Sequence, residues 1–297
     1  MITGLLRRLV RSRRVQRIAL ASGALEELSK PYLVGSGPAQ AGREAGVLRS
    51  RGLDVSFTYL PQGDGAEETP GELEALLDTL GDRARGVELS VKPSHLGIRD
   101  SPERATTTLR RLVRAADEAG ALVTLEMQCH AEYRETLRLW RAVHADHPDL
   151  GITLPVDIRR VERDCVGIVD DAPRLRLCIG SYPIPKPLGF RTGHEKSKAL
   201  VRCLRIAMEG GARTMLASHD PTIIAIAQDL QRRTDGDFEF QMFHGVRPLE
   251  QRRLADIGYR SRVLLPYGPG WFEYLMTRVT TRPQTAFSYL RAVLDKR

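Results

Sequence analysis

The chain has 297 residues, which suits one barrel-sized domain or two small ones, and its 42% hydrophobic and 28% charged content is ordinary for a globular protein. No stretch approaches the roughly 20 apolar residues that a membrane-spanning helix needs. The formal net charge of +8 comes largely from arginines interleaved with acids, without the aromatic-studded basic stripe that stacks nucleic-acid bases, so it predicts a solvated arginine-rich surface and no nucleic-acid partner.

The N-terminal segment, residues 1–20, mixes arginines with Leu, Val and Ile and has no secretory cleavage pattern. It predicts an amphipathic surface helix with at most peripheral membrane contact. We therefore expect a helical extension over residues 1–50 and a barrel over 51–297. The cysteines form no CxxC pair, which predicts neither a zinc site nor a disulfide framework and fits a reducing cytoplasm; they are Cys129, Cys165, Cys178 and Cys203.

From about residue 50 onward, short apolar runs alternate with segments of helical periodicity. The predicted strands are Asp54–Leu60, Gly86–Val91, Ala121–Met127, Gly151–Leu154, Leu175–Gly180, Arg213–Ala217, Asp237–Gln241 and Arg262–Leu265. The predicted helices include Pro102–Ala119, Glu132–His144, Glu195–Glu209, Thr222–Arg233 and Pro248–Ile257.

Eight strands alternating with helices over about 230 residues match the count and size of an α/β TIM-like (β/α)8 barrel. An open, doubly wound sheet is the alternative, because alternation by itself does not distinguish closure. No GxGxxG follows the first strand, which counts against a dinucleotide-binding open sheet and favours the closed barrel.

Chemically active side chains are expected at the C-terminal ends of the barrel strands. Lys92 directly follows the second strand, and Glu126 lies within the predicted third strand. A buried acid needs a partner, so we expect an ion pair between Glu126 and Lys92. That pair has two readings, a catalytic role or a purely structural one.

The later strand ends carry further candidates. Asp220 is placed to cap the helix that begins at Pro221, which leaves His219 as the functional candidate of that strand end. Gln241 and His244 are expected near the same mouth, and Tyr274 and Arg278 share one face of the last helix. These residues predict a barrel enzyme that binds an anionic small molecule, without indicating a redox reaction.

The ordered set of strand-end segments resembles the proline dehydrogenase family, from about residue 50 to 290. Its SxK segment is matched by Ser90-Val91-Lys92, its strand-four arginine by Arg160, and its KGAY by Ile179-Gly180-Ser181-Tyr182. Its ATH is matched by Ala217-Ser218-His219, its FEFQ…GVRP by Phe238–Pro248, and its PYG…W…YL.RR by Pro266-Tyr267-Gly268, Trp271, Tyr274-Leu275 and Thr277-Arg278.

The resemblance implies a flavoprotein oxidoreductase of amino-acid metabolism that binds FAD noncovalently at the strand C-termini and passes hydride from substrate to flavin N5. By position, Arg160 would lie near flavin N5, and Lys92, Glu126 and Arg160 would be catalytic. Flavin contacts would come from Arg160, Gly180, Ser181, Tyr182, Ser218, His219 and Gln241. Substrate contacts would come from Lys92, Leu264, Tyr274, Thr277 and Arg278, and no metal is implied.

Several substrate-side positions depart from the family pattern. The first arginine of the family's carboxylate-binding pair is Thr277 here, and the tyrosine beside the proline ring is Leu264. The strand-three aspartate is Glu126, and the lysine of KGAY is Ile179. Because the clamp and the ring wall change together, the substitutions predict an altered substrate.

The resulting hypothesis is an FAD-dependent dehydrogenase acting on a C–N or N–N bond of a small amine-containing acid, with L-proline as the default substrate. The electron acceptor, a quinone or oxygen, is left open. Two alternatives from other classes are a catalytically silent barrel that acts as a binding or scaffold protein, and a basic nucleic-acid-binding module.

Overall fold

The computed structural model describes residues 34–63, 65–171, 173–180, 182–234, 236–271 and 274. Within them, eight parallel strands form a closed barrel in chain order, β1 to β8. The predicted (β/α)8 barrel is therefore confirmed, and the open-sheet alternative is wrong. The expected helix over residues 1–20 lies outside the described residues, as do Ser181, Thr277 and Arg278.

All eight predicted strands are present; β6 has the predicted ends, and the other strands have ends shifted by a few residues. They are β1 (Asp54–Tyr59), β2 (Glu88–Val91), β3 (Leu122–Leu125), β4 (Gly151–Pro155), β5 (Arg174–Cys178), β6 (Arg213–Ala217), β7 (Phe238–Phe243) and β8 (Arg260–Tyr267). The third strand ends at Leu125, so Glu126 follows it and does not lie within it. β8 is longer than predicted because it pairs with β1 along its length, from Asp54 opposite Arg262 to Tyr59 opposite Tyr267.

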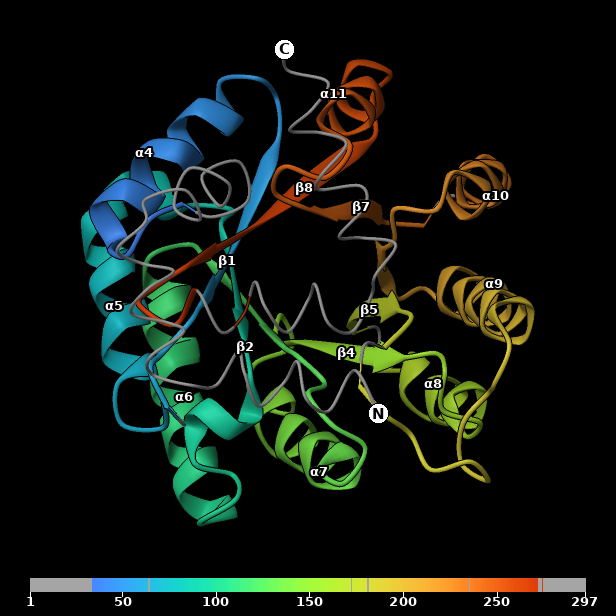
Figure 1. Ribbon diagram of the computed structural model, residues 1–297, viewed down its shortest axis with the longest axis horizontal. Coiled ribbons are helices and arrows are strands. Elements are labelled where there is room, and N and C mark those ends of the chain that lie inside the picture. The colour runs from blue at the N-terminus through green and yellow to red at the C-terminus, as the bar shows by residue number, and fades with distance from the viewer. Residues whose placement is uncertain are drawn as a thin grey trace, which may run out of the picture.

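Helices form an outer ring around the strands (Figure 1). They are α4 (Pro38–Arg49), α5 (Thr69–Leu80), α6 (Pro102–Glu118), α7 (Tyr133–His144), α8 (Val161–Val169), α9 (Gly193–Glu209), α10 (Pro221–Gln231) and α11 (Pro248–Asp256). Most strand residues are buried because one face of each strand contacts these helices and the other faces the barrel interior. Leu109, Trp140, Leu200 and Ile224 are examples of the helix residues that fill the outer layer.

Local sequence signals set several helix starts. Ser101 accepts a hydrogen bond from the Arg104 amide at the start of α6, and Thr192 and Glu195 form a reciprocal capping box on α9. Asp220 accepts hydrogen bonds from the amides of Thr222 and Ile223, so its predicted capping role on α10 is confirmed. These caps fix where the strand-end loops stop and the helices begin.

The barrel interior contains a polar network instead of the branched apolar layers usual in this fold. Its buried members are Ser56, Glu88, Ser90, Thr124, Arg174, Arg176, Glu239, Gln241 and Arg262. They come from alternate positions of six strands, because every second residue of a strand points inward. Three of these side chains are arginines and two are glutamates, so the charges nearly balance.

Glu88 lies at the centre of this network. Its Oε2 accepts from Arg174 Nη2 at 2.7 Å and from Thr124 Oγ1 at 2.6 Å, and its Oε1 accepts from Ser56 Oγ at 2.8 Å and from Arg176. Burial by itself raises the pKa of this carboxyl. The surrounding arginines outweigh that effect and hold the pKa of Glu88 well below its ordinary value. Glu88 is therefore a buried, fully hydrogen-bonded carboxylate.

Arg262 joins the last strand to the first ones. Its Nη1 donates to the carbonyl oxygens of Val55 at 2.9 Å and Gly86 at 3.0 Å. Its Nε and Nη2 donate to Glu239 at 2.9 and 3.1 Å. One side chain thus connects β8 to β1, to the start of β2 and to β7.

Candidate functional site

The C-terminal ends of the strands form one mouth of the barrel, where parallel barrels place their functional groups. The structure brings Lys92, Glu126, Gly180, Tyr182 and His219 to this end, because each directly follows a strand or lies in the loop after it. Gln241 and Leu264 lie within β7 and β8, below the strand ends. These residues thus come from six different strands or the loops that follow them.

The predicted ion pair between Lys92 and Glu126 is absent from the part of the chain that the structure describes. Glu126 Oε1 instead accepts a hydrogen bond from Ser90 Oγ at 2.9 Å. Ser90 is in turn held by Arg176 Nη1 at 2.7 Å, which draws the glutamate toward β2 below the lysine. Lys92 and Glu126 are both half-buried, so the mouth offers a cation and an anion that do not neutralise each other.

Gln241 is buried, and both polar atoms of its side chain have hydrogen-bond partners. Its Oε1 accepts from Arg176 Nε at 2.5 Å, and its Nε2 donates to Glu239 Oε1 at 2.5 Å. His244, predicted near the same mouth, directly follows β7 and so lies at the same end of the barrel as Gln241. Burial lowers the pKa of His244, and the opposing influence comes from Glu44 on α4, outside the barrel wall.

His219 is fixed against the next strand. Its Nε2 accepts the Phe243 amide proton at 3.0 Å, which places the ring proton on Nδ1, and its ring stacks on Phe243 at 5.4 Å between centroids. The guanidinium of Arg247 donates to the His219 carbonyl at 2.8 Å. Arg247 has a left-handed backbone, φ 53°, and begins α11. The loops after β6 and β7 are therefore locked together.

Arg160 lies in the loop after β4, directly before α8, and so also lies at the C-terminal end of the strands. Its Nε and Nη2 donate to the two carboxylate oxygens of Asp164 at 2.6 and 2.7 Å, and its side chain is 41% exposed. Its guanidinium also lies 5.7 Å from the centre of the Tyr133 ring, and Tyr133 donates to Asp164 at 2.8 Å. Among the described residues, no hydrogen bond or ion pair joins Arg160 to Gln241 or Lys92.

Two residues of the site region were missed by the sequence analysis. Arg176 is the arginine that reaches the barrel interior beneath the mouth, and the inward alternation of Arg174, Arg176 and Cys178 on β5 was the available signal. Asp157 follows β4 and accepts from the Gly180 amide at 3.0 Å. A side chain at position 180 would meet Asp157 Oδ1 at 2.7 Å, which explains the glycine.

Tyr182 has a hydroxyl that is buried and, among the described residues, has no hydrogen-bond partner. Burial raises the pKa of this hydroxyl above its ordinary range, so it is a neutral donor. A buried donor without a partner is costly unless a ligand satisfies it. Tyr182 therefore fits a ligand-contacting position in the loop after β5.

Three further predicted site residues, Ser218, Leu264 and Tyr274, lie after β6, within β8 and after β8. Ser218 Oγ accepts the Asp220 amide at 3.2 Å, so it helps to form the turn after β6. Leu264 is half-buried and shares the inward face of β8 with Arg262. The Tyr274 amide donates to the Gly270 carbonyl at 3.3 Å, as expected of a helical turn there.

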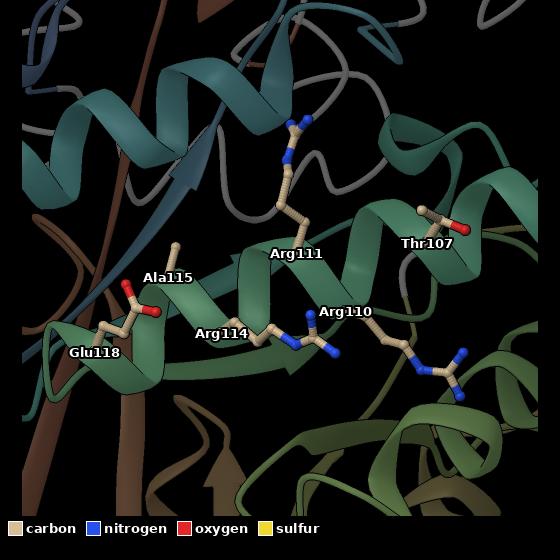
Figure 2. Close-up of a pocket in the computed structure, with 6 residues that line it drawn as sticks. All are labelled: Thr107, Arg110, Arg111, Arg114, Ala115 and Glu118. Atoms are coloured by element: carbon tan, nitrogen blue, oxygen red, sulfur yellow. The ribbon is translucent and has the colours of Figure 1, made fainter.

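A separate hollow of about 490 Å³ lies on the outer ring and not at the mouth. Figure 2 shows Arg110 and Arg114 extending to one side of α6 and Arg111 to the other. Arg111 pairs with Glu74 at 2.8 Å, and Arg110 lies 3.5 Å from Asp146. Because all its lining side chains come from one exposed helix, we interpret the hollow as part of a solvated charged surface. The full lining is Thr107, Arg110, Arg111, Arg114, Ala115 and Glu118.

The described residues include no helix long and apolar enough to cross a membrane. No cluster of three or more His, Cys, Asp or Glu side chains within them is placed to hold a metal ion.

Among the solved structures that the chain resembles are those of proline utilization A (PutA). The enzyme from Bdellovibrio bacteriovorus, inactivated by N-propargylglycine, aligns over 93% of this chain with a TM-score of 0.79 and 19% identity. A Bradyrhizobium japonicum PutA mutant, D778Y, aligns over 92% with a TM-score of 0.73 and 18% identity. The chain covers only 36% and 32% of those proteins, so the likeness concerns the fold of one part of them.

No family model matches the chain. Its sequence relatives do identify a family. Proline dehydrogenase 1 of Bacillus subtilis strain 168 is 30% identical over 256 residues, which cover 84% of this chain and 85% of that protein. Proline dehydrogenase of Deinococcus radiodurans is 29% identical over 219 residues, 69% of each chain. Identity at this level, over most of both chains, identifies this barrel as a member of the proline dehydrogenase family.

Proposed function

We propose that the protein is an FAD-dependent dehydrogenase that oxidises a C–N or N–N bond in a small amine-containing acid. Family membership supports an oxidoreductase. The observation that carries the substrate class is the pair of charges at the mouth, Lys92 and Glu126, which are not neutralised by each other. A cation and an anion held apart complement a molecule that itself bears both charges, such as an amino acid.

The described residues fit FAD. Tyr182 supplies a buried hydroxyl without a partner among them. Tyr182, Gly180, His219 and Gln241 are the described residues that would hold the cofactor, with Ser181, Ser218 and Arg160 as further proposed contacts. When bound, FAD supplies the two-electron acceptor for the substrate hydride.

The chain's own residues would bind and orient the substrate. Lys92, with Arg278 of the last helix, would hold the carboxylate, and Tyr274 and Leu264 would shape the side of the pocket. Glu126 would face the amine end, where oxidation removes a proton from nitrogen as hydride leaves the neighbouring carbon. We further propose that L-proline is a poor substrate, because Thr277, Leu264 and Glu126 alter one pocket together.

The test is to purify the protein, measure its flavin content and mix it anaerobically with a panel of secondary amines while following flavin bleaching. We expect a yellow protein whose flavin is reduced by an amine-containing acid, and more slowly by L-proline than by that substrate. Colourless protein that also fails to take up added FAD would contradict the enzyme assignment and favour a binding or scaffold role.

A further inference from the structure

A directed chain of hydrogen bonds runs from Arg176 through Ser90 to Glu126. Arg176 Nη1 lies 2.7 Å from Ser90 Oγ, and Ser90 Oγ lies 2.9 Å from Glu126 Oε1. A guanidinium has donors only, so Ser90 must accept from Arg176, and its single hydroxyl proton is left for Glu126. The direction of both bonds follows from this chemistry alone.

Arg176 is itself immobilised, because each of its three nitrogen atoms has a different partner. Nε donates to Gln241 at 2.5 Å, Nη1 to Ser90 at 2.7 Å, and Nη2 to Glu88. Arg176 and Ser90 are both buried, whereas Glu126 is half-buried at the mouth. The rigid interior network is thus connected to one carboxylate at the mouth.

We propose that Ser90 is a positioning residue, which fixes the Glu126 carboxylate on the β2 side of the mouth and apart from Lys92. This role rests on the proposed function, in which Glu126 faces the amine of the substrate. A glutamate has more side-chain torsions to fix than an aspartate, so its carboxylate needs a tether to keep one orientation. Ser90 provides that tether with a hydroxyl donor whose oxygen is held by Arg176.

The test compares Ser90→Ala, which removes the donor, with Ser90→Thr, which keeps a hydroxyl. Ser56→Ala is the matched control: Ser56 also donates to a buried carboxylate of the network, Glu88, at 2.8 Å, and it makes no contact with Glu126. In the FAD-loaded protein, we expect Ser90→Ala to lower kcat for the substrate found in the amine panel about tenfold, with a smaller change in KM. Ser90→Thr should stay within about threefold of the native kcat, and so should Ser56→Ala.

A double-mutant cycle with Glu126→Ala, which removes the acceptor, isolates the contact. We expect Ser90→Ala to lower kcat far less in the Glu126→Ala background than in the native one, while Ser56→Ala has the same small effect in both. Equal loss of kcat in Ser90→Ala and Ser56→Ala would overturn the positioning role, since it would reflect general damage to the network.

Thermal unfolding of the same variants gives a readout that needs no activity. The Tm changes of Ser90→Ala and Glu126→Ala should be non-additive, and those of Ser56→Ala and Glu126→Ala additive. If no amine reduces the flavin, the proposed function fails by itself. Whether or not an amine reduces the flavin, additive Tm changes for the Ser90 and Glu126 variants would overturn the proposed positioning role of Ser90.

Discussion

At the scale of single residues, the site is defined by which charges are already paired. Arg160 is engaged by Asp164 and Arg176 by Glu88, whereas Lys92 makes no ion pair with any described residue. A half-buried cation is energetically costly unless an anion pairs with it. Substrate recognition should therefore depend on Lys92 and on the other cation predicted beside it, Arg278.

Changing Arg278 to Met should lower kcat/KM for the true substrate about 10²-fold. The reason is the loss of one charged hydrogen-bonding group from the substrate carboxylate, which costs about 2–3 kcal/mol. Steady-state kinetics of flavin reduction measures this change in kcat/KM. Arg205→Met on α9, whose side chain pairs with Glu209 at the surface and with no other described residue, is the control and should leave kcat/KM unchanged. A change of less than threefold in Arg278→Met would refute the assignment.

Restoring the family residues should improve proline as a substrate. Thr277→Arg returns the second carboxylate-binding arginine, and Leu264→Tyr returns an aromatic wall with a hydroxyl. We expect the double variant to gain about 10²-fold or more in kcat/KM for L-proline, because these contacts act in the transition state. Stopped-flow flavin reduction by proline, hydroxyproline, pipecolate, sarcosine and hydrazino acids measures the shift. Native protein that already prefers proline over the panel would show that the substitutions are tolerated drift.

At the scale of elements, the strand and helix pattern was readable from the sequence because apolar runs and caps are local signals. β6 was predicted to the residue, and Asp220 was recognised as a cap. The partner of Glu126 was not predictable in the same way. Its orientation depends on Arg176, which lies 86 residues from Ser90 and meets it only after the barrel has closed.

The cap of α10 gives an element-scale prediction. Asp220→Ala should lower the free energy of unfolding by about 1 kcal/mol, because the amides of Thr222 and Ile223 lose their acceptor. Asp229→Ala on the same helix, which loses only surface pairs with Arg232 and Arg233, should cost about 0.5 kcal/mol or less. Urea unfolding monitored by circular dichroism compares the two, and equal costs would contradict the capping role.

At the scale of the whole molecule, the interior network makes barrel stability depend on charge. Glu88 is fully buried and its pKa is depressed by Arg176, Arg174 and Arg262, against the effect of burial. A carboxyl with a lowered folded-state pKa contributes stability that is fully present above its unfolded value. That contribution is lost as the pH falls from about the ordinary value of 4.5 through the depressed one.

Glu88→Gln should therefore destabilise the native protein by about 3–5 kcal/mol at neutral pH, because it leaves buried arginines without their counter-charge. The difference in Tm between native and variant proteins should narrow as the pH is lowered below about 4.5. Calorimetry from pH 7 to pH 3 measures both. A Tm difference that stays constant over this range would show that the ionised form of Glu88 is not what stabilises the barrel.

The reach of Arg262 also determines when the molecule can become a barrel. Its donors meet the carbonyls of Val55 and Gly86, 207 and 176 residues earlier in the chain, and β8 pairs with β1 along six positions. On the ribosome, none of these contacts exists until β8 has emerged. The nascent chain must therefore carry β1 without its β8 partner through most of its synthesis, and Glu239 lacks its arginine partner until Arg262 has been added. Closure is necessarily a late, long-range event, and the last strand acts as the seam of the barrel.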